Sequence, residues 1–114
     1  MSAEENKAII RRLYDELFGQ WNLALIDELF SPDYIGHELP AGTPPGPAGV
    51  HQLYASIRAG FPEITLSAQD FIAEGDKVVV RWIAQHAPTT GIAIYRLHEG
   101  KIVERWVEVT FHQA

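Results

Sequence analysis

The chain has 114 residues, 46% of them hydrophobic, and a formal net charge of −6 at neutral pH. This length predicts one domain, residues 1–114, that buries roughly two-thirds of its unfolded surface. The acidic balance, without a stripe of basic residues, disfavours nucleic acid as a partner. Because the chain has no cysteine, disulfides and thiolate chemistry are excluded.

The N-terminal segment favours a cytoplasmic location. Glu4 and Glu5 stand where a signal peptide would carry basic residues, and the Ile9-Ile10 pair is too short for its apolar region. Because the chain has no long apolar run, we also expect no membrane partner.

Helical signals dominate the first half of the chain. Ser2 and Glu5 form a capping box, and an apolar stripe of helical period follows it as far as Gly19, a residue suited to ending a helix. A second helix is predicted over Asn22 to Phe30 and a third over Pro47 to Ala59.

The segment between these two helices is less regular. Tyr34 to Glu38 has the pattern of a short strand, and Leu39 to Gly49 is dominated by proline and glycine. A loop of this length in a small domain is usually functional or mobile, so we interpret it either as the rim of a pocket or as a plain connector.

After Pro62 the apolar period changes from 3.6 to 2, which predicts strands. One strand begins at Ile64, a second covers Val78 to His86, and Gly91 to Phe111 contains two more. Asp70 interrupts an apolar face, so it is either a buried functional acid or the site of a bulge that turns its side chain outward. We favour the bulge. Helices followed by hairpins indicate the α+β class.

Several segments carry a family resemblance, and they follow one another along nearly the whole chain. They are Phe30–Tyr34 leading to His37, Gly46–Val50, Phe61–Glu63, Glu74–Trp82 and Gly91–Trp106. Taken together they resemble the SnoaL-like polyketide cyclase family, within the nuclear-transport-factor-2-like superfamily.

The resemblance implies N-terminal helices packed on a strongly curved mixed β-sheet, a cone-shaped α+β barrel with a pocket inside. It also implies a homodimer formed through the outer face of the sheet, a hydrophobic small molecule as ligand, and no metal or organic cofactor. Family members cyclise polyketides by aldol chemistry, and relatives isomerise steroids or hydrolyse epoxides. The active sites of these proteins share a carboxylate inside an apolar cone.

The sequence departs from this pattern in two places. Thr110, four residues after Trp106, stands where such cyclases often have an aspartate, whereas Glu108 stands where the epoxide-hydrolysing relatives keep one. The connection over residues 85–90 is also shorter than in family members, so the mouth of the barrel is expected to be clipped.

Glu108 is the leading catalytic candidate. It shares one face of a strand with Trp106 and Thr110, and we expect that face to line the cone. Desolvation beside the indole would raise the pKa of the Glu108 carboxyl toward neutrality, which suits acid/base catalysis. The alternative is that Glu108 faces solvent or pairs with Arg81 or Arg105.

The opposite face of the same strand is apolar, with Val103, Val107, Val109 and Phe111. We expect it to point outward and to be covered by helices or by the partner subunit of a homodimer.

Two histidines are further catalytic candidates, because histidine titrates near neutral pH. His37 precedes the proline-rich segment and could reach the mouth of the cone, and His86 is expected on the same strand face as Trp82. Either could instead be structural. The spacing of the histidines matches no metal-binding motif, so no metal site is expected.

Two functions remain open from the sequence. In an enzyme that moves protons on a hydrophobic substrate, the substrate contacts would come from the following side chains: Tyr34, Tyr54, Trp82, Trp106 and Thr110. If the larger aromatic residues fill the interior instead, the chain would be a non-catalytic binding or dimerisation module of the same fold.

Overall fold

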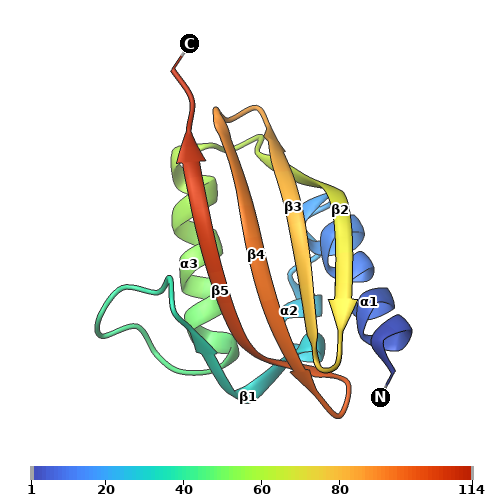
Figure 1. Ribbon diagram of the computed structural model, residues 1–114. Helices are drawn as coiled ribbons and strands as arrows, with labels where there is room; N and C mark the ends of the chain where they lie inside the picture. The colour runs from blue at the N-terminus through green and yellow to red at the C-terminus, as the bar shows by residue number, and fades with distance from the viewer. Residues whose placement is uncertain (1, 114) are drawn as a thin grey trace.

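The computed structural model describes residues 2–113 and arranges them as helices packed on one curved sheet (Figure 1). The elements in chain order are α1 (Ala3–Arg12), η1 (Leu13–Phe18), α2 (Ala24–Leu29), β1 (Phe30–Gly36), α3 (Pro47–Gly60), β2 (Thr65–Glu74), β3 (Lys77–Gln85), β4 (Thr89–His98) and β5 (Lys101–Phe111). No helix in residues 2–113 is long and apolar enough to span a membrane.

The sheet is mixed, with the strand order β1-β5-β4-β3-β2. β1 runs parallel to β5, whereas the pairs β5–β4, β4–β3 and β3–β2 are antiparallel. The sheet does not close on itself, and the helices lie behind it while the face toward the viewer has no helical cover (Figure 1). The α+β fold with N-terminal helices on a curved mixed sheet is therefore confirmed.

The N-terminal helical segment starts at the predicted capping box and ends at Gly19 as predicted, but its second half is not α-helical. The Ser2 hydroxyl accepts from the Glu5 backbone N–H, and the Glu5 carboxylate accepts from the Ser2 backbone, so the capping box is present. Beyond Arg12 the chain winds into the π-helix η1, which buries Leu13, Tyr14, Leu17 and Phe18. A π-helical turn is rare and wider than an α-helical one, and here it brings these four large side chains into the core.

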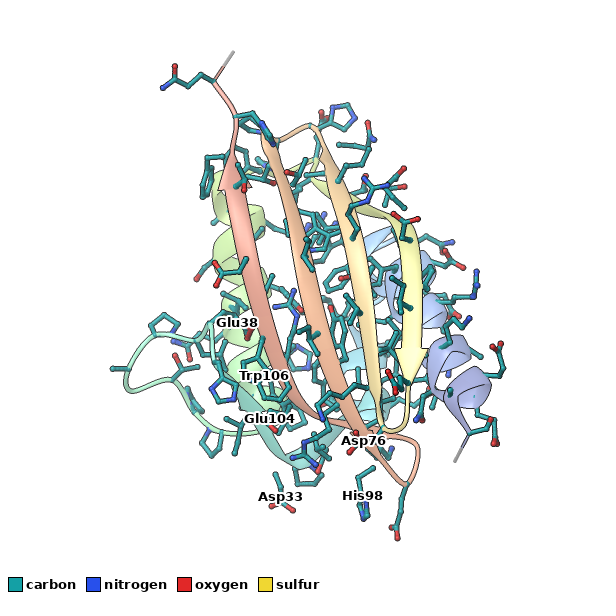
Figure 2. All side chains as sticks on the ribbon, in the orientation of Figure 1. Asp33, Glu38, Asp76, His98, Glu104 and Trp106 are labelled. Atoms are coloured by element: carbon teal, nitrogen blue, oxygen red, sulfur yellow. The ribbon has the colours of Figure 1, made fainter. Side chains whose placement is uncertain are left out.

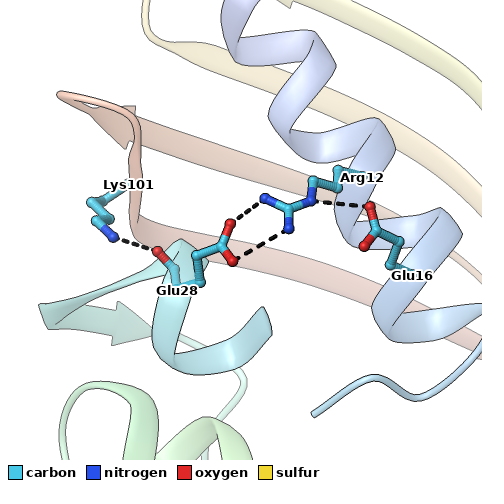
Figure 3. Close-up of polar contacts among 4 residues, drawn as sticks. All are labelled: Arg12, Glu16, Glu28 and Lys101. Atoms are coloured by element: carbon cyan, nitrogen blue, oxygen red, sulfur yellow. Dashed lines mark hydrogen bonds and ion pairs between the residues drawn. The ribbon is translucent and has the colours of Figure 1, made fainter. Parts of the chain in front are cut away.

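An ion cluster on the surface ties the helices to each other and to the last hairpin (Figure 3). Arg12 binds the Glu28 carboxylate with both terminal nitrogens and the Glu16 carboxylate with Nε, at 3.0 Å. The Lys101 ammonium donates to the Glu28 backbone carbonyl. These hydrogen bonds lower the pKa of the Glu28 carboxyl, with Arg12 as the main cause.

Two irregularities decide which way side chains point along the sheet. The β2–β3 register shifts between Ala68 and Asp70, and Asp70 lies exposed at 2.6 Å from Arg81, so the predicted bulge is confirmed. The β4–β5 register shifts after Ile102 pairs with Leu97, because one extra residue is inserted on β5. That insertion reverses the facing of the rest of β5.

A close contact between β3 and β4 fixes the largest side chain on the inner wall. Trp82 pairs with Gly91 across the two strands, and a Cβ on Gly91 would lie 2.3 Å from the indole ring. Only a residue without a side chain leaves room for the ring to lie across β4. The Trp82 Nε1 atom is buried without a hydrogen-bond partner in residues 2–113, so packing alone holds the indole.

We predict that Gly91→Ala destabilises the protein by about 1–3 kcal/mol, because the added methyl group overpacks the wall against Trp82. The free energy of unfolding, measured in urea, checks this. Gly60→Ala is the matched control, since a Cβ there meets no atom within 4 Å. Equal stability of both variants would contradict the contact.

Candidate functional site

A cavity of about 330 Å³ lies between α3 and the concave face of the sheet. Its walls are almost wholly apolar and come from η1, α3, the four strands β2 to β5 and the loops next to them. Among the side chains that line it are the following: Trp21, Glu38, Tyr54, Phe61, Trp82, Arg105, Val109 and Phe111. A pocket of this size and character suits a small hydrophobic molecule.

The main polar feature of this cavity is a buried ion pair at one end. Arg105 Nη1 donates to Glu38 Oε2 at 3.0 Å, and the two side chains are 5% and 13% exposed. The Tyr34 hydroxyl donates to the other oxygen of Glu38 at 3.4 Å. A charged pair that is removed from water in this way is stable only when both partners and further hydrogen bonds are present.

Two tyrosines extend the pair into the core. Arg105 Nε donates to the Tyr95 hydroxyl at 3.1 Å, and the hydroxyls of Tyr95 and Tyr14 lie 2.9 Å apart. Burial acts to lower the pKa of Arg105, but the surrounding acidic groups, Tyr95, Tyr54 and Glu38 foremost, outweigh it and raise that pKa well above its usual value. The guanidinium is therefore a permanent positive charge in the interior.

Arg105 reaches the interior because of the extra residue in β5. After the register shift Arg105 pairs with Tyr95 of β4, and Tyr95 is fully buried. Directly opposite residues of neighbouring strands point to the same face, so Arg105 points inward with Tyr95. Val107, Val109 and Phe111 follow at intervals of two and line the cavity as well.

The predicted facing of this strand is therefore wrong. Glu108 and Thr110 are exposed, and with Trp106 they lie on the outer face. Of the apolar residues expected to face outward, Val107, Val109 and Phe111 line the cavity instead. The physical reason is the hydrophobic effect: the inward facing of the valines takes them toward α3 and leaves the Glu108 carboxylate hydrated.

The outer face has a second hollow, of about 590 Å³, that contains Glu108. The His37 ring stacks on Trp106 there, with centroids 5.0 Å apart, and its Nε2 lies 2.7 Å from the Glu104 carboxylate. Trp106 and Glu104 lie close to each other along β5 in Figure 2. The hydrogen bond from His37, followed by that from Arg96, lowers the pKa of Glu104. This hollow is larger than the inner cavity but open to water, so it does not desolvate a bound molecule as the inner cavity does.

The other predicted contacts divide between the two sides. Tyr54 and Trp82 line the inner cavity, and the buried Tyr34 reaches it through Glu38. His86 lies exposed in the turn after β3, in a left-handed backbone conformation, so it does not share the face of Trp82 as predicted. Whether the predicted residues act in catalysis stays a prediction.

Glu38 and Arg105 are site residues that the sequence did not indicate. An arginine between Glu104 and Trp106 has the pattern of a solvent-facing residue, and its partner is 67 residues away in the chain. A one-residue insertion in β5 was the signal that could have found them, and the sequence does not mark it.

Comparisons with known proteins agree with this architecture. A scan against protein families matches residues 8–110 to the SnoaL-like polyketide cyclase family. The chain therefore belongs to this family, and the resemblance seen in the sequence is confirmed. A search of curated proteins found no match.

Solved structures with the same fold include several bacterial proteins. IdmH of Streptomyces antibioticus, proposed to be a polyketide cyclase, is 26% identical, with a TM-score of 0.78 over 91% of each chain. A proposed polyketide cyclase of Bacillus cereus ATCC 10987 is 25% identical, with a TM-score of 0.82 over 96% of this chain and 78% of that one. AclR of Streptomyces galilaeus, a proposed hydroxylase, is 21% identical over 96% of this chain and 81% of that one, and its TM-score of 0.79 supports the fold alone.

We predict that the buried tyrosines make the fold sensitive to alkali. Burial is the main cause that raises the pKa of Tyr14, Tyr34 and Tyr54 above the unfolded value of about 10. The stability they contribute is therefore present below pH about 10 and is lost as the pH rises further, because only the unfolded chain ionises there.

Tyrosinate absorbance should then appear together with the loss of circular dichroism, in one cooperative step. Tyr54→Phe should remove one tyrosine from that step. A gradual titration of all tyrosines in the folded protein near pH 10 would contradict the burial.

Proposed function

We propose that this protein is a cofactor-independent enzyme that binds a hydrophobic, oxygen-bearing small molecule in the inner cavity and moves a proton on it. The observation that carries the proposal is the Glu38–Arg105 pair, which brings a carboxylate and a fixed positive charge to an apolar cavity. Such a pair provides the two groups that acid/base chemistry next to a carbonyl requires.

In the proposed reaction the ligand's carbonyl oxygen accepts a hydrogen bond from the Arg105 guanidinium. The Glu38 carboxylate removes a proton from the adjacent carbon, and the electrons of that C–H bond move into an enolate stabilised by Arg105. Return of the proton from Glu38 to another carbon gives an isomerisation. Attack of the enolate carbon on a second carbonyl of the same molecule breaks that C=O π bond, and the resulting alkoxide takes the proton back from Glu38, which gives an aldol cyclisation. No oxidant or reductant is needed for either outcome.

The main alternative within the enzyme class uses the outer hollow, with Glu108 as the acid or base that the sequence predicts. Glu108 and His37 both line that hollow, which favours it. The exposure of Glu108 counts against it, because a carboxylate and a substrate that stay in contact with water gain little from the protein environment.

A non-catalytic binding module of the same fold is the alternative from another class. In that case the Glu38–Arg105 pair would hold the ligand without any proton transfer. Turnover of a bound compound separates this alternative from the enzyme, since both predict binding in the cavity.

We predict that Glu38→Gln lowers turnover by about 10²–10⁴-fold, because it removes the proposed base and leaves a side chain of the same shape. The measurement is turnover on a panel of polyketide-like diketones, enones and epoxides. Glu108→Gln tests the outer hollow in the same assay, and Glu74→Gln, an exposed carboxylate at the end of β2, is the matched control.

Loss of activity in Glu108→Gln with retention in Glu38→Gln would move the chemistry to the outer hollow. If compounds bind without turnover by the wild-type protein on the whole panel, the binding module is favoured instead. Thermal unfolding of each variant shows whether a loss of activity is only a loss of fold.

A homodimer through the outer face of the sheet is a separate proposal. Ile72 and Ile92 are at least half exposed on strands β2 and β4, and no helix covers this face (Figure 1). Charges of both signs surround them, with Lys77 and Arg81 near Asp70 and Glu108, so the face is complementary to a second copy of itself.

We predict that the protein sediments as a dimer at micromolar concentration and that Ile92→Glu shifts it to a monomer, because the new carboxylate would be buried between two sheets. Leu23→Glu is the control, since Leu23 is also exposed but precedes α2 on the helical side. A monomeric wild-type protein would contradict this proposal.

A further inference from the structure

The inner cavity has two unlike ends, and together they restrict the ligand more narrowly than the proposed function does. One end holds the Glu38–Arg105 pair. The other is reached six residues further along β5, at Phe111, a strand distance of about 20 Å. The inference below rests on the proposed function, because it assumes that the ligand occupies this cavity.

The polar end is electrically balanced. The positive charge of Arg105 is already met by Glu38 at 3.0 Å, and the hydroxyl of Tyr95 occupies Nε. A ligand carboxylate would add a second negative charge beside one cation in an apolar space, which is costly. An uncharged oxygen adds no net charge and can still accept from Arg105 or donate to Glu38.

The other end is apolar and open. Phe61, Val109 and Phe111 all line the cavity, yet they are 38%, 44% and 70% exposed. Phe61 follows the end of α3 and Phe111 ends β5, two ends that lie side by side at the top of Figure 1. The apolar wall therefore continues from the interior onto the surface as a rim of large side chains.

We infer that the ligand is a long, uncharged amphipathic molecule bound head first. A keto or hydroxyl oxygen lies against the Glu38–Arg105 pair, and an apolar tail leaves the cavity across Phe61, Val109 and Phe111. We assign the exposed rim to the ligand's tail because the same residues that form the rim also line the cavity. The rim residues then set the preferred length of the ligand.

The test measures the affinity of straight-chain methyl ketones of increasing length, with the fluorescence of Trp21 and Trp82, which both line the cavity, as the readout. Each added methylene should tighten binding by about fourfold while it is being buried. In Phe111→Ala the gain should stop at a shorter chain, with no change for short ketones. Leu23→Ala, which removes an exposed apolar side chain outside both the cavity and the proposed dimer face, is the matched control.

Fatty acids of the same chain lengths test the head group. The wild-type protein should bind the ketone at least about tenfold more tightly than the acid, because the acid adds an unpaired charge. Glu38→Gln leaves the guanidinium without its counter-charge and should reverse this order. If that variant does not fold, the comparison of ketone with acid in the wild-type protein still decides the point.

Three outcomes would overturn the inference. The first is that affinity rises with ketone length equally in Phe111→Ala and the wild-type protein. The second is that the wild-type protein binds the acid more tightly than the ketone. The third is that Phe111→Ala changes sedimentation but not ketone affinity, which would assign the rim to a second copy of the chain. Failure of every ketone to bind would instead remove the proposed use of the cavity. Binding of short ketones without the tail effects would leave the proposed function intact.

Discussion

The structure depends on one joint, where the end of β1 meets the middle of β5. Three consecutive residues of β5 hold two consecutive residues of the chain that leaves β1. Arg105 points inward and pairs with Glu38, while its neighbours Glu104 and Trp106 point outward and bind the His37 ring (Figure 2). The His37 backbone N–H donates to the Arg105 carbonyl at 3.0 Å, which aligns the two segments.

This joint links the fold to the chemistry, because the alternation of a strand puts one contact on each side of the sheet. The outer contacts fix the position of His37, so the side chain of the next residue, Glu38, points into the cavity. Removing one member of the inner pair would leave a buried charge alone, at a cost of about 3–5 kcal/mol. The charged pair in the cavity is thus also a structural tie between the two segments.

The sequence predicts those parts of the fold that local patterns determine. The capping box at Ser2, the start of α3 at Pro47 and the bulge at Asp70 all follow from neighbouring residues, and each is confirmed. α2 begins at Ala24, two residues later than predicted, and Leu23, which makes no side-chain capping hydrogen bond, takes the N-cap position in place of Asn22. These differences do not affect the site.

The candidate site is harder to predict because it depends on contacts between distant residues. The alternation in β5 identifies which side chains share a face, and that part of the interpretation holds. It does not say which face is the inner one, and the family resemblance favoured the face of Glu108. The apolar character of Val107, Val109 and Phe111 points to the other answer, but no local pattern indicates that Arg105 is buried with them.

Under the proposed function, the acid of the inner cavity comes from a different part of the fold than the family resemblance implies. The resemblance implies a carboxylate on the last strand, whereas here the inner carboxylate comes from the residues after β1, the parallel neighbour of that strand. Adjacent strands of a curved sheet reach the same interior, so either can supply the acid while the other supplies its counter-charge. In the proposed site, the last strand β5 therefore supplies the arginine and the segment after β1 supplies the acid. The pair, rather than the position of one carboxylate, defines that site.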